Sequence, residues 1–334
     1  MKRVHLHGPN DVRLAEVETP VPGPRDAVIR VTACGICGSD VKYVAQGGLA
    51  GPTARPMPLG HELSGVVEAV GTEVEGVRPG ARVVLNPLGA GNMIGNGGRE
   101  GGFAPLLLVE NAAAGESLLE IPKDLPLEIA ALAEPLGVGM NAVDQAEAQP
   151  GDKVAVFGAG PIGLAAIACL ADRGVEDVVA VDLSPRRLEI ARQLGARACV
   201  RADETDAWKA LRDLHGTEPV MGAPMVGTDA YIEASGASRV LEELPGQAKA
   251  NARVAVVALH YAPVPVSFLL VMMKQLTLRG AMEYPEDYSR TIELLGRRDL
   301  SPMITHRFPL DRFEEGLEVA RSPHLGAKVM IDLP

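Results

Sequence analysis

The sequence is short of cysteine and of positive charge, and each shortage excludes a class of protein. Four cysteines in a chain of 334 residues are too few for a disulfide scaffold. Cys34 and Cys37 form a CxxC pair, but no second pair follows to complete a four-thiolate zinc site. The formal net charge is -11 and the pI is near 5.2, which argues against binding nucleic-acid phosphates or an anionic membrane. We therefore expect no nucleic-acid partner and no membrane partner.

The sequence also lacks an N-terminal signal pattern, because its first three residues, Met-Lys-Arg, lead into mixed polar sequence and not into an apolar core. Two long uncharged runs occur, yet neither predicts a membrane span. The run 154–171 is interrupted by a glycine turn, and Val254–Met273 contains a histidine and two prolines. The second run instead predicts a buried strand, a loop and the start of a helix. These features predict a cytoplasmic protein, and the length predicts two domains.

One stretch carries the clearest chemical signal. A short β-rich run, Val154–Phe157, leads into the glycine-rich turn 158–163 (GAGPIG) and then into a helical run of small residues. A second strand, Val178–Val181, follows and ends at Asp182. Strand, glycine turn, helix, strand and terminal acid together form a βαβ unit of the kind that binds a dinucleotide.

Each residue type in the glycine turn has a physical role. Gly158 lets the chain turn off the strand, and Gly160 lets the backbone approach a pyrophosphate closely. Gly163 lets the helix pack tightly on the strand. Pro161 and Ile162 open the helix, whose free N–H groups face the phosphates. We expect these five positions to contact the cofactor.

Asp182 and the arginines that follow it bear on the choice of cofactor. A carboxylate at Asp182 can accept both ribose hydroxyls of NAD and repels the 2′-phosphate of NADP. Arg186 and Arg187 could instead favour NADP, but an acid in the ribose position opposes that interpretation. The sequence therefore predicts NAD.

The remaining sequence indicates two kinds of domain. The stretch up to about Val109 is rich in short strands separated by Gly- and Pro-rich turns, which predicts a β-barrel-like domain. From Asp152 onward strands and helices alternate, which is typical of a doubly wound parallel sheet. Between these regions, Pro126–Gln149 predicts a helix with a break at Glu134-Pro135. Other predicted elements are strands at Asp26–Thr32, Glu62–Val70, Arg82–Leu85, Ala230–Glu233, Arg253–Leu259 and Lys328–Leu333, and helices at Ile162–Arg173, Pro185–Leu194 and Asp287–Gly296.

A series of motifs runs along the whole chain in this order: CGICGSDVKY, GHE, EPLGVG, GAGPIG, VDLSPRRLEIARQLGA, EASGA and RGAMEY. With these motifs the chain resembles the zinc-dependent medium-chain dehydrogenases, in particular their polyol (sorbitol-type) branch. The resemblance implies an α/β protein in which a GroES-like β-barrel catalytic domain carries an inserted Rossmann domain. The implied catalytic domain is 1–145 plus 283–334, and the implied NAD-binding Rossmann domain is 146–282.

The resemblance assigns ligands for one catalytic zinc. Cys37 matches a thiolate ligand and His61 an imidazole ligand. Glu134 matches a position that polyol dehydrogenases fill with a carboxylate, and Glu62 matches a glutamate that ligates directly or through water. One sulfur, one nitrogen and one oxygen ligand with an open fourth position is a catalytic arrangement. Asp40 matches a carboxylate that orients His61.

The resemblance also implies a reaction, in which zinc eases loss of the alcohol proton and a hydride moves to the nicotinamide. Ser39 matches the hydroxyl that first receives that proton. Lys42 stands where many relatives carry a histidine of the proton relay. Lys42 serves there only if burial or the metal makes it release its proton more easily; otherwise it is a surface lysine and the proton leaves through water.

Further cofactor contacts follow from the same resemblance. Arg187 matches a position beside the adenine. The nicotinamide half is expected to contact Ser235, Gly236, Ala258 and Leu259.

The chain departs from the family in places that bear on metal content and substrate. Many relatives hold a structural zinc with four cysteines, but the corresponding segment Asn86–Gly102 has none, so we expect no structural zinc. Glu283 stands where sorbitol-type enzymes tend to carry an arginine near the substrate, with Tyr284 beside it. Tyr43 lines up with a substrate-facing aromatic residue, and Asn141 replaces a common histidine. Polyol specificity therefore does not transfer directly.

The sequence predicts a zinc-dependent, NAD-linked oxidoreductase that interconverts a small secondary alcohol, diol or polyol and its ketone. By resemblance it is a homodimer or homotetramer. Two alternatives stay open: a zinc-free quinone or enoyl reductase of the same fold, and a non-catalytic NAD-binding protein. Cys37, His61 and Glu134 together speak against the first alternative.

Overall fold

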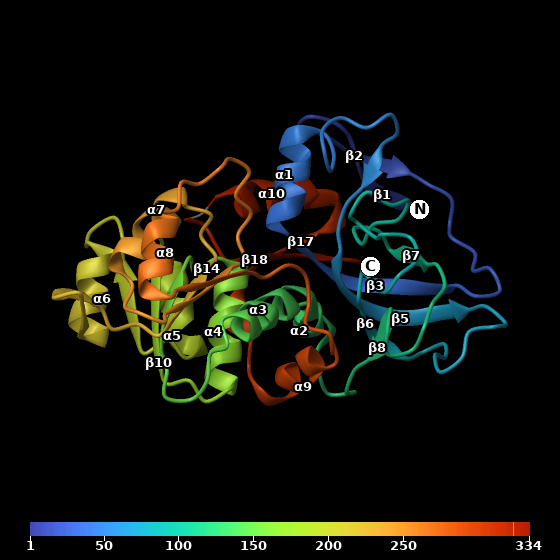
Figure 1. Ribbon diagram of the computed structural model, residues 1–334. Coiled ribbons are helices and arrows are strands. Elements are labelled where there is room, and N and C mark those ends of the chain that lie inside the picture. Colours follow the sequence, from blue (N-terminus) through green and yellow to red (C-terminus); the bar gives the residue numbers. More distant parts are fainter. Residues whose placement is uncertain (323) are drawn as a thin grey trace. The chain divides into compact units, whose positions relative to one another are not determined.

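The computed structural model describes residues 1–322 and 324–334, which form two compact units. Unit 1 comprises Met1–Glu134 and Tyr288–Pro334, and unit 2 comprises Pro135–Asp287 (Figure 1). The units therefore divide at 134/135 and 287/288, whereas the sequence predicts boundaries at 145/146 and 282/283. Most of helix α3 (Ala133–Gln145) consequently belongs to unit 2.

Unit 1 is built on a seven-stranded sheet with the strand order β17-β18-β3-β5-β6-β8, in which β7 also pairs with β3. A three-stranded sheet, β2-β1-β4, completes its β structure. The strands are β1 (Lys2–Gly8), β2 (Asp11–Glu16), β3 (Ala27–Ile36), β4 (Met57–Pro58), β5 (Glu62–Val70), β6 (Arg82–Leu85), β7 (Leu106–Val109), β8 (Leu118–Glu120), β17 (Ile304–Pro309) and β18 (Lys328–Asp332). The helices are α1 (Gly38–Gln46), α2 (Leu127–Ala130), α9 (Arg290–Arg297) and α10 (Phe313–Arg321), with 3₁₀ turns at Ser301–Met303 and Leu310–Arg312.

The two ends of the chain meet in the larger sheet of unit 1. Strand β18 pairs antiparallel with β3, so that Val329 lies opposite Ile36. On its other side β3 pairs with β5, so that Gly35 lies opposite Glu62. Both neighbours of β3 are therefore in register at the end of the strand that leads into Cys37. Fully buried Ile29, Leu107 and Ile331 belong to the hydrophobic core that holds these strands together.

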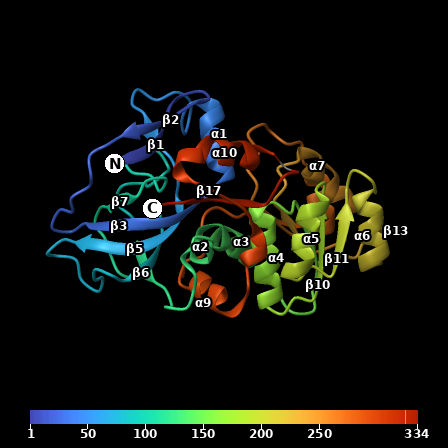
Figure 2. The same ribbon diagram turned by 180° about the vertical axis from the view of Figure 1, so that it is seen from behind.

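Unit 2 contains a six-stranded parallel sheet with the order β11-β10-β9-β14-β15-β16. Helices α4 and α5 contact each other and β10, and Figure 2 shows them side by side. Its strands are β9 (Lys153–Phe157), β10 (Asp177–Asp182), β11 (Ala198–Arg201), β14 (Ala230–Glu233), β15 (Arg253–Val256) and β16 (Thr277–Gly280), with a hairpin of β12 (Thr217–Val220) and β13 (Ala223–Val226). Besides α3, its helices are α4 (Pro161–Asp172), α5 (Pro185–Leu194), α6 (Ala207–His215), α7 (Ser238–Gln247) and α8 (Phe268–Lys274).

The predicted fold class is confirmed: a β-sheet domain carries an inserted, doubly wound parallel sheet. The predicted helix break at Glu134-Pro135 is wrong. The break lies at residues 131–132, between α2 and α3, and Pro135 falls in the first turn of α3. The N–H that proline lacks would have no intrahelical partner there, so Pro135 is compatible with a helix start.

Helix length also bears on membranes. In the part of the chain that the structure describes, no helix combines the length and the apolar character needed to span a bilayer.

Candidate metal centre and cofactor site

The loops that carry Cys37 and His61 are fixed by one buried carboxylate. Asp40, in the first turn of α1, accepts a hydrogen bond from the Cys37 N–H at 2.9 Å and one from the Gly60 N–H at 3.3 Å. Gly60 has a φ of +96°, a left-handed conformation that favours glycine. Burial raises the pKa of Asp40, although His61 and the two N–H donors act against the rise. Asp40 thus ties the start of α1 to the residue that precedes His61.

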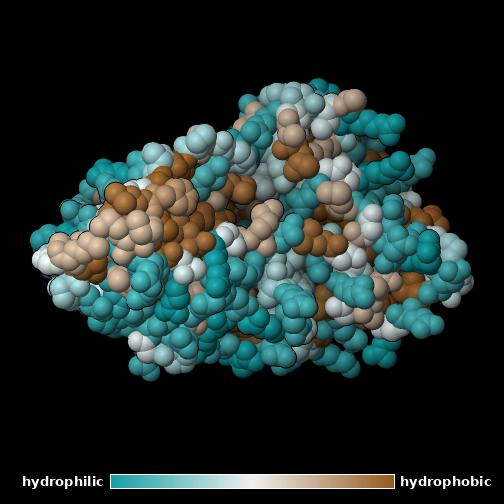
Figure 3. Space-filling view, in the orientation of Figure 1, coloured by the Kyte–Doolittle hydropathy of each residue, from teal (hydrophilic) through white to brown (hydrophobic). Residues whose placement is uncertain are grey.

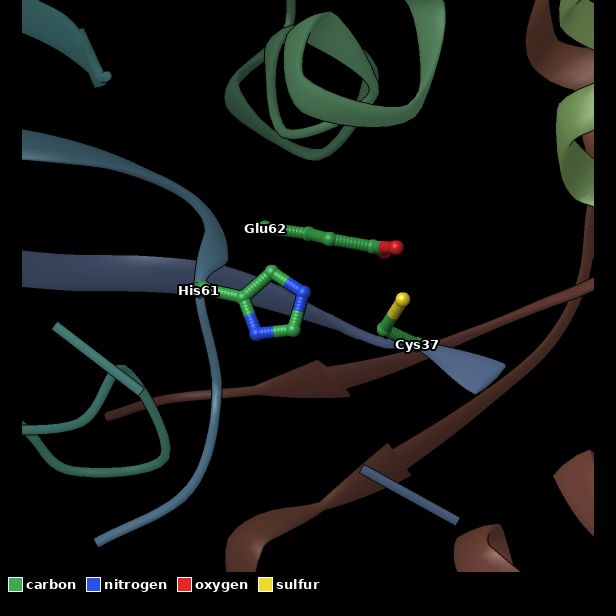
Figure 4. Close-up of side chains that lie close together, drawn as sticks. All are labelled: Cys37, His61 and Glu62. Atoms are coloured by element: carbon green, nitrogen blue, oxygen red, sulfur yellow. The ribbon is translucent and has the colours of Figure 1, made fainter. Parts of the chain in front are cut away.

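Three potential ligands converge beside this carboxylate. Cys37 Sγ, a His61 ring nitrogen and a Glu62 carboxylate oxygen all lie within 4.8 Å of one another, and they point into the same space (Figure 4). His61 and Glu62 are buried, and Cys37 is partly buried. Thiolate, imidazole and carboxylate are the donors that Zn²⁺ uses in proteins, and three of them leave a position open. The donor set therefore fits a catalytic zinc.

The charges around His61 are consistent with a cation site. His61 Nδ1 is buried without a hydrogen bond in the described structure, and Asp40 Oδ1 lies 3.9 Å away, too far for one. Ser39 Oγ lies 3.4 Å from His61 Nε2. Burial alone would lower the pKa of His61, but the negative charges of Asp40, Cys37 and Glu134 outweigh it and raise the pKa well above its usual value. The surrounding groups thus favour positive charge.

Lys328 is a functional residue that the sequence analysis missed. Its Nζ lies 2.6 Å from each carboxylate oxygen of Glu62 and donates to the Ile36 carbonyl at 3.2 Å. Lys328 and Glu62 are both buried, so they form an ion pair shielded from water. Burial lowers the pKa of Lys328, but Glu62 and Cys37 outweigh it and raise the pKa. The available sequence signal was a lysine directly before the apolar run Val329–Ile331 of the strand KVMID.

Glu134 is not one of the three converging ligands, yet its charge reaches the site. It lies buried in the first turn of α3, and its negative charge contributes to raising the pKa values of His61 and Lys328. Tyr288 is also close: burial raises the pKa of its hydroxyl, and Glu134 and Glu62 raise it further. The sequence did not single out Tyr288.

Helix α1 brings three predicted residues to one face, because Ser39, Lys42 and Tyr43 are spaced by three and four positions. The Tyr43 hydroxyl donates to Asn96 Oδ1 at 3.2 Å, which joins α1 to the cysteine-free segment Asn86–Gly102. Lys42 is partly buried.

The cysteine-free segment is anchored by packing and backbone hydrogen bonds. Ile94 is fully buried, and the Gly102 N–H donates to the Gly60 carbonyl at 2.8 Å. A Cβ added to Gly95 would lie 2.2 Å from the same carbonyl. The segment therefore presses directly on the backbone before His61.

The glycine turn of unit 2 has the geometry that a dinucleotide requires. Gly158 has a φ of +92°, and a Cβ on it would lie 2.7 Å from Ser235 N. A Cβ on Gly163 would lie 1.7 Å from the Gly158 carbonyl oxygen, so only glycine allows this helix–strand contact. A Cβ on Gly160 would meet only Arg187 Nη1, at 3.9 Å, so the chain there is open to a ligand. Pro161 is the first residue of α4, and Ile162 beside it is partly exposed.

Asp182 ends β10 beside this turn. Its Oδ2 accepts the Ala159 N–H at 2.6 Å and its Oδ1 accepts the Ser184 N–H at 2.7 Å. A carboxylate has about four acceptor positions, so two remain for ribose hydroxyls. Burial lowers the pKa of Arg187, and the negative charge of Asp182 partly offsets this effect.

The remaining predicted contacts lie in loops of unit 2. Ser235, Gly236 and Leu259 are exposed, and Ala258 is partly buried, beyond the ends of β14 and β15. Met282 directly precedes Glu283 and Tyr284. Its carbonyl accepts a hydrogen bond from Asn141 Nδ2 at 2.8 Å. Glu283 has a φ of +64°, unusual for a residue with a side chain, and Asn141 holds that turn.

Two family models match the chain: the alcohol dehydrogenase GroES-like domain over residues 23–123 and the zinc-binding dehydrogenase over residues 161–297. The (R,R)-butanediol dehydrogenase of Neisseria gonorrhoeae is 32% identical, with 95% of each chain covered. The chain belongs to the zinc-dependent medium-chain dehydrogenase family. Human sorbitol dehydrogenase, another member, is 30% identical, with 98% of this chain and 94% of the human protein covered.

Solved structures of this zinc-dependent family share the fold. The 2R,3R-butanediol dehydrogenase from Bacillus subtilis superimposes with a TM-score of 0.86, 28% identity and 99% coverage of both chains. A Sinorhizobium meliloti protein described as a zinc-binding dehydrogenase and bound to NADP superimposes with a TM-score of 0.85 and 27% identity, covering 99% of this chain and 98% of that one. As a member of this family, the chain uses zinc and a nicotinamide cofactor.

Proposed function

We propose that this chain is an NAD-linked alcohol dehydrogenase that interconverts a secondary alcohol, diol or polyol and the matching ketone, with one zinc per subunit. The observation that carries the proposal is that Cys37 Sγ and a His61 ring nitrogen converge beside buried carboxylates, in a chain that also contains the dinucleotide-binding turn. The names of its relatives, butanediol and sorbitol dehydrogenase, support a substrate with neighbouring hydroxyl groups.

The zinc is held by Cys37, His61 and a carboxylate, which we take to be Glu134. Both carboxylate oxygens of Glu62 already accept hydrogen bonds from Lys328, so coordination of a metal by Glu62 would disturb a buried ion pair. Glu134 is buried and its charge acts on His61. When bound, Zn²⁺ supplies Lewis acidity that eases loss of the alcohol proton.

The proton leaves through groups of α1. Ser39 Oγ, 3.4 Å from His61 Nε2, is the hydroxyl next to the ligands and receives the proton first. Lys42 lies one helical turn further along the same face and passes the proton on when its amine is neutral; with a charged Lys42 the proton leaves through water. Tyr43, tied to Asn96, lines the substrate side of that helix. Glu283 and Tyr284 are proposed as further substrate contacts.

NAD is the proposed cofactor, supported by the carboxylate of Asp182 beside the glycine turn. It accepts the hydroxyls of the adenosine ribose, and Arg187 lies beside the adenine. The pyrophosphate lies against Gly160 and the first turn of α4, where the chain is open. No specific observation favours a zinc-free reductase or a non-catalytic protein over this function.

The protein is proposed to be cytoplasmic and to work as a homodimer or homotetramer. Figure 3 shows hydrophobic side chains gathered over α8, where Phe268, Leu269 and Met272 are 75%, 62% and 66% exposed. Strand β16 is the last strand of the parallel sheet in the same unit, and within residues 1–322 and 324–334 only its β15 side is paired. An apolar patch beside an open sheet edge suits a second copy of the chain. Sedimentation equilibrium tests this, and a monomer at micromolar concentration contradicts it.

The function is tested by measuring NAD reduction with a panel of diols, polyols, amino alcohols and aryl alcohols. We expect at least one diol or polyol to be oxidised by the protein purified without chelator. Cys37→Ser should lose nearly all of that activity while still binding NADH, because the thiolate holds the metal and not the cofactor. Activity that survives Cys37→Ser unchanged would rule out the proposed metal site.

A further inference from the structure

A buried carboxylate lies at the carboxyl end of a central strand of the parallel sheet in unit 2. Glu233 is fully buried and is the last residue of β14, the strand beside β9. Strands β10 and β11 follow β9 in the chain and lie on one side of it in the sheet. Strands β14, β15 and β16 come later in the chain and lie on the other side. In open parallel sheets, ligands bind at the carboxyl ends of the two strands where the order reverses. Glu233 therefore lies at that switch point.

In the described part of the chain, the side-chain carboxylate of Glu233 accepts from the two loops that follow β14 and β15. Its Oε1 accepts the N–H groups of Ser235 and Gly236, each at 2.9 Å, and the Ser235 hydroxyl. Its Oε2 lies 2.9 Å from His260 Nε2. Because a carboxylate surrounded by these donors acts as an acceptor, the imidazole hydrogen is assigned to Nε2. A buried carboxylate is stable only when donors surround it, so these hydrogen bonds stabilise both the Glu233 carboxylate and the two loops.

His260 turns inward from an otherwise exposed segment. Its side chain is 11% exposed, whereas the neighbouring Leu259 and Tyr261 are 55% and 64% exposed. Its Nδ1 is buried and has no hydrogen-bond partner among residues 1–322 and 324–334. Within those residues the contact with Glu233 is thus the polar contact that holds the His260 side chain in place. Sequence inspection noted His260 only as a polar residue in an uncharged run.

The contact between His260 and Glu233 joins two loops, 234–237 after β14 and 257–261 after β15. The Glu233 carbonyl accepts the N–H groups of Val257 and Ala258, at 3.0 and 3.1 Å, so the same residue binds the second loop through its backbone. A Cβ on Gly236 would lie 3.8 Å from Ala258 Cβ, which shows how closely the loops approach.

We propose that His260 is a positioning residue for the nicotinamide half of the dinucleotide, because through Glu233 it locks the two loops that flank that half. The inference rests on the proposed function, together with the expectation from the sequence that the nicotinamide half contacts Ser235, Gly236, Ala258 and Leu259 in these loops. The adenosine half is read by Asp182, at the end of β10. Loss of the His260 contact should therefore weaken binding of the nicotinamide half and leave binding of the adenosine half unchanged.

Two ligands separate these halves: NADH, and ADP-ribose, which lacks the nicotinamide. The variants are His260→Ala, which removes the donor, and His260→Gln, which can still donate to Glu233. His215→Gln is the matched control, because His215 is another buried histidine beside an acid in unit 2. Its Nε2 lies 3.3 Å from Asp177 Oδ1, at the opposite, amino end of β10. Calorimetric titration of the full-length, zinc-loaded protein gives Kd for each pair.

We expect His260→Ala to raise the Kd of NADH about tenfold, the scale of one lost hydrogen bond to a charged group, and that of ADP-ribose less than about twofold. His260→Gln should stay within about threefold of wild type for both ligands, and His215→Gln should leave the ratio of the two Kd values unchanged. Hydrogen–deuterium exchange should accelerate in 234–237 and 257–261 of His260→Ala only. An unchanged ratio, or equal weakening of both ligands, overturns the inference. Failure of wild type to bind either ligand overturns the proposed function itself.

Discussion

At the scale of single residues, a buried ion pair between Glu62 and Lys328 lies beside the proposed metal ligands. The two side chains are 0% and 1% exposed, and Lys328 Nζ lies 2.6 Å from both carboxylate oxygens. Removing one member of such a pair leaves an uncompensated buried charge, whereas removing both often has little effect. The main effect of the pair is therefore to fix the position of the Glu62 side chain, and its net contribution to the free energy of unfolding is small.

Lys328→Met is predicted to lower the free energy of unfolding by about 3–5 kcal/mol, because Glu62 is then buried without a counter-charge. The double variant Glu62→Gln/Lys328→Met should recover most of that loss. Urea denaturation followed by circular dichroism measures both. Additive losses in the double variant would show that the two residues do not act as a pair.

A second prediction at this scale concerns Asp182, which accepts two backbone N–H groups and is proposed to accept the ribose hydroxyls of NAD. Asp182→Gly removes the charge that repels a 2′-phosphate, so the ratio of kcat/KM for NAD to that for NADP should fall by about tenfold or more. Steady-state kinetics with both cofactors measure the ratio. A ratio that does not move shows that another residue reads the ribose.

Residue types and spacing could predict the glycine turn, because its geometry is local, whereas Cys37 and His61 were assigned through the resemblance of the whole motif series to a family. Residue types and spacing could not predict the Glu62–Lys328 pair, whose members are separated by 266 positions and meet only because β3 lies between β5 and β18. The contact of His260 with Glu233 was hidden for the same reason, since two parallel strands bring these residues together.

At the scale of elements, the cysteine-free segment Asn86–Gly102 supports the loop that carries His61. A Cβ on Gly95 would lie 2.2 Å from the Gly60 carbonyl, whereas one on Gly97 would meet only Leu49, at an ordinary 3.5 Å. Both glycines have positive φ, +67° and +93°, so alanine strains the backbone similarly at either position. The two positions differ in the group that the added methyl contacts, which is the Gly60 backbone at Gly95 and the Leu49 side chain at Gly97.

Gly95→Ala is therefore predicted to displace the backbone before His61 and to lower the zinc content and the activity severalfold. Gly97→Ala, the matched control, should lose only about 1 kcal/mol of stability and keep its zinc. Metal analysis and rate measurements on the two purified variants decide the question. Equal zinc content in both would show that the segment does not support the ligand loop.

Element boundaries show where local pattern was insufficient. Helix α5 begins at Pro185 and ends at Leu194 as predicted, because Ser184 caps its start and Gly195 follows its end. Pro135, by contrast, was taken as a helix break although it stands in the first turn of α3. A proline permits both outcomes, and the surrounding apolar residues did not distinguish them. The hairpin of β12 and β13 turns at Met221-Gly222, which carries no strong turn signal apart from the glycine.

At the scale of the whole molecule, the proposed metal ligands and the proposed cofactor contacts lie in different units. Cys37, His61, Glu62, Glu134 and Lys328 belong to unit 1, and the glycine turn, Asp182 and the loops after β14 and β15 belong to unit 2. The final strand β18 returns to unit 1 and supplies Lys328 to the metal site. Metal removal is therefore expected to abolish turnover and to leave NADH binding intact.

The most direct test of the account is a zinc titration of the metal-depleted protein, with bound zinc and NAD-dependent oxidation of the best diol or polyol measured on the same samples. We predict that the rate rises in proportion to bound zinc and levels off at about one zinc per chain, as one catalytic site of this donor type requires, while the Kd for NADH stays constant throughout. Full activity in protein with less than about a tenth of an equivalent of zinc, with no gain when zinc is added, would contradict the account.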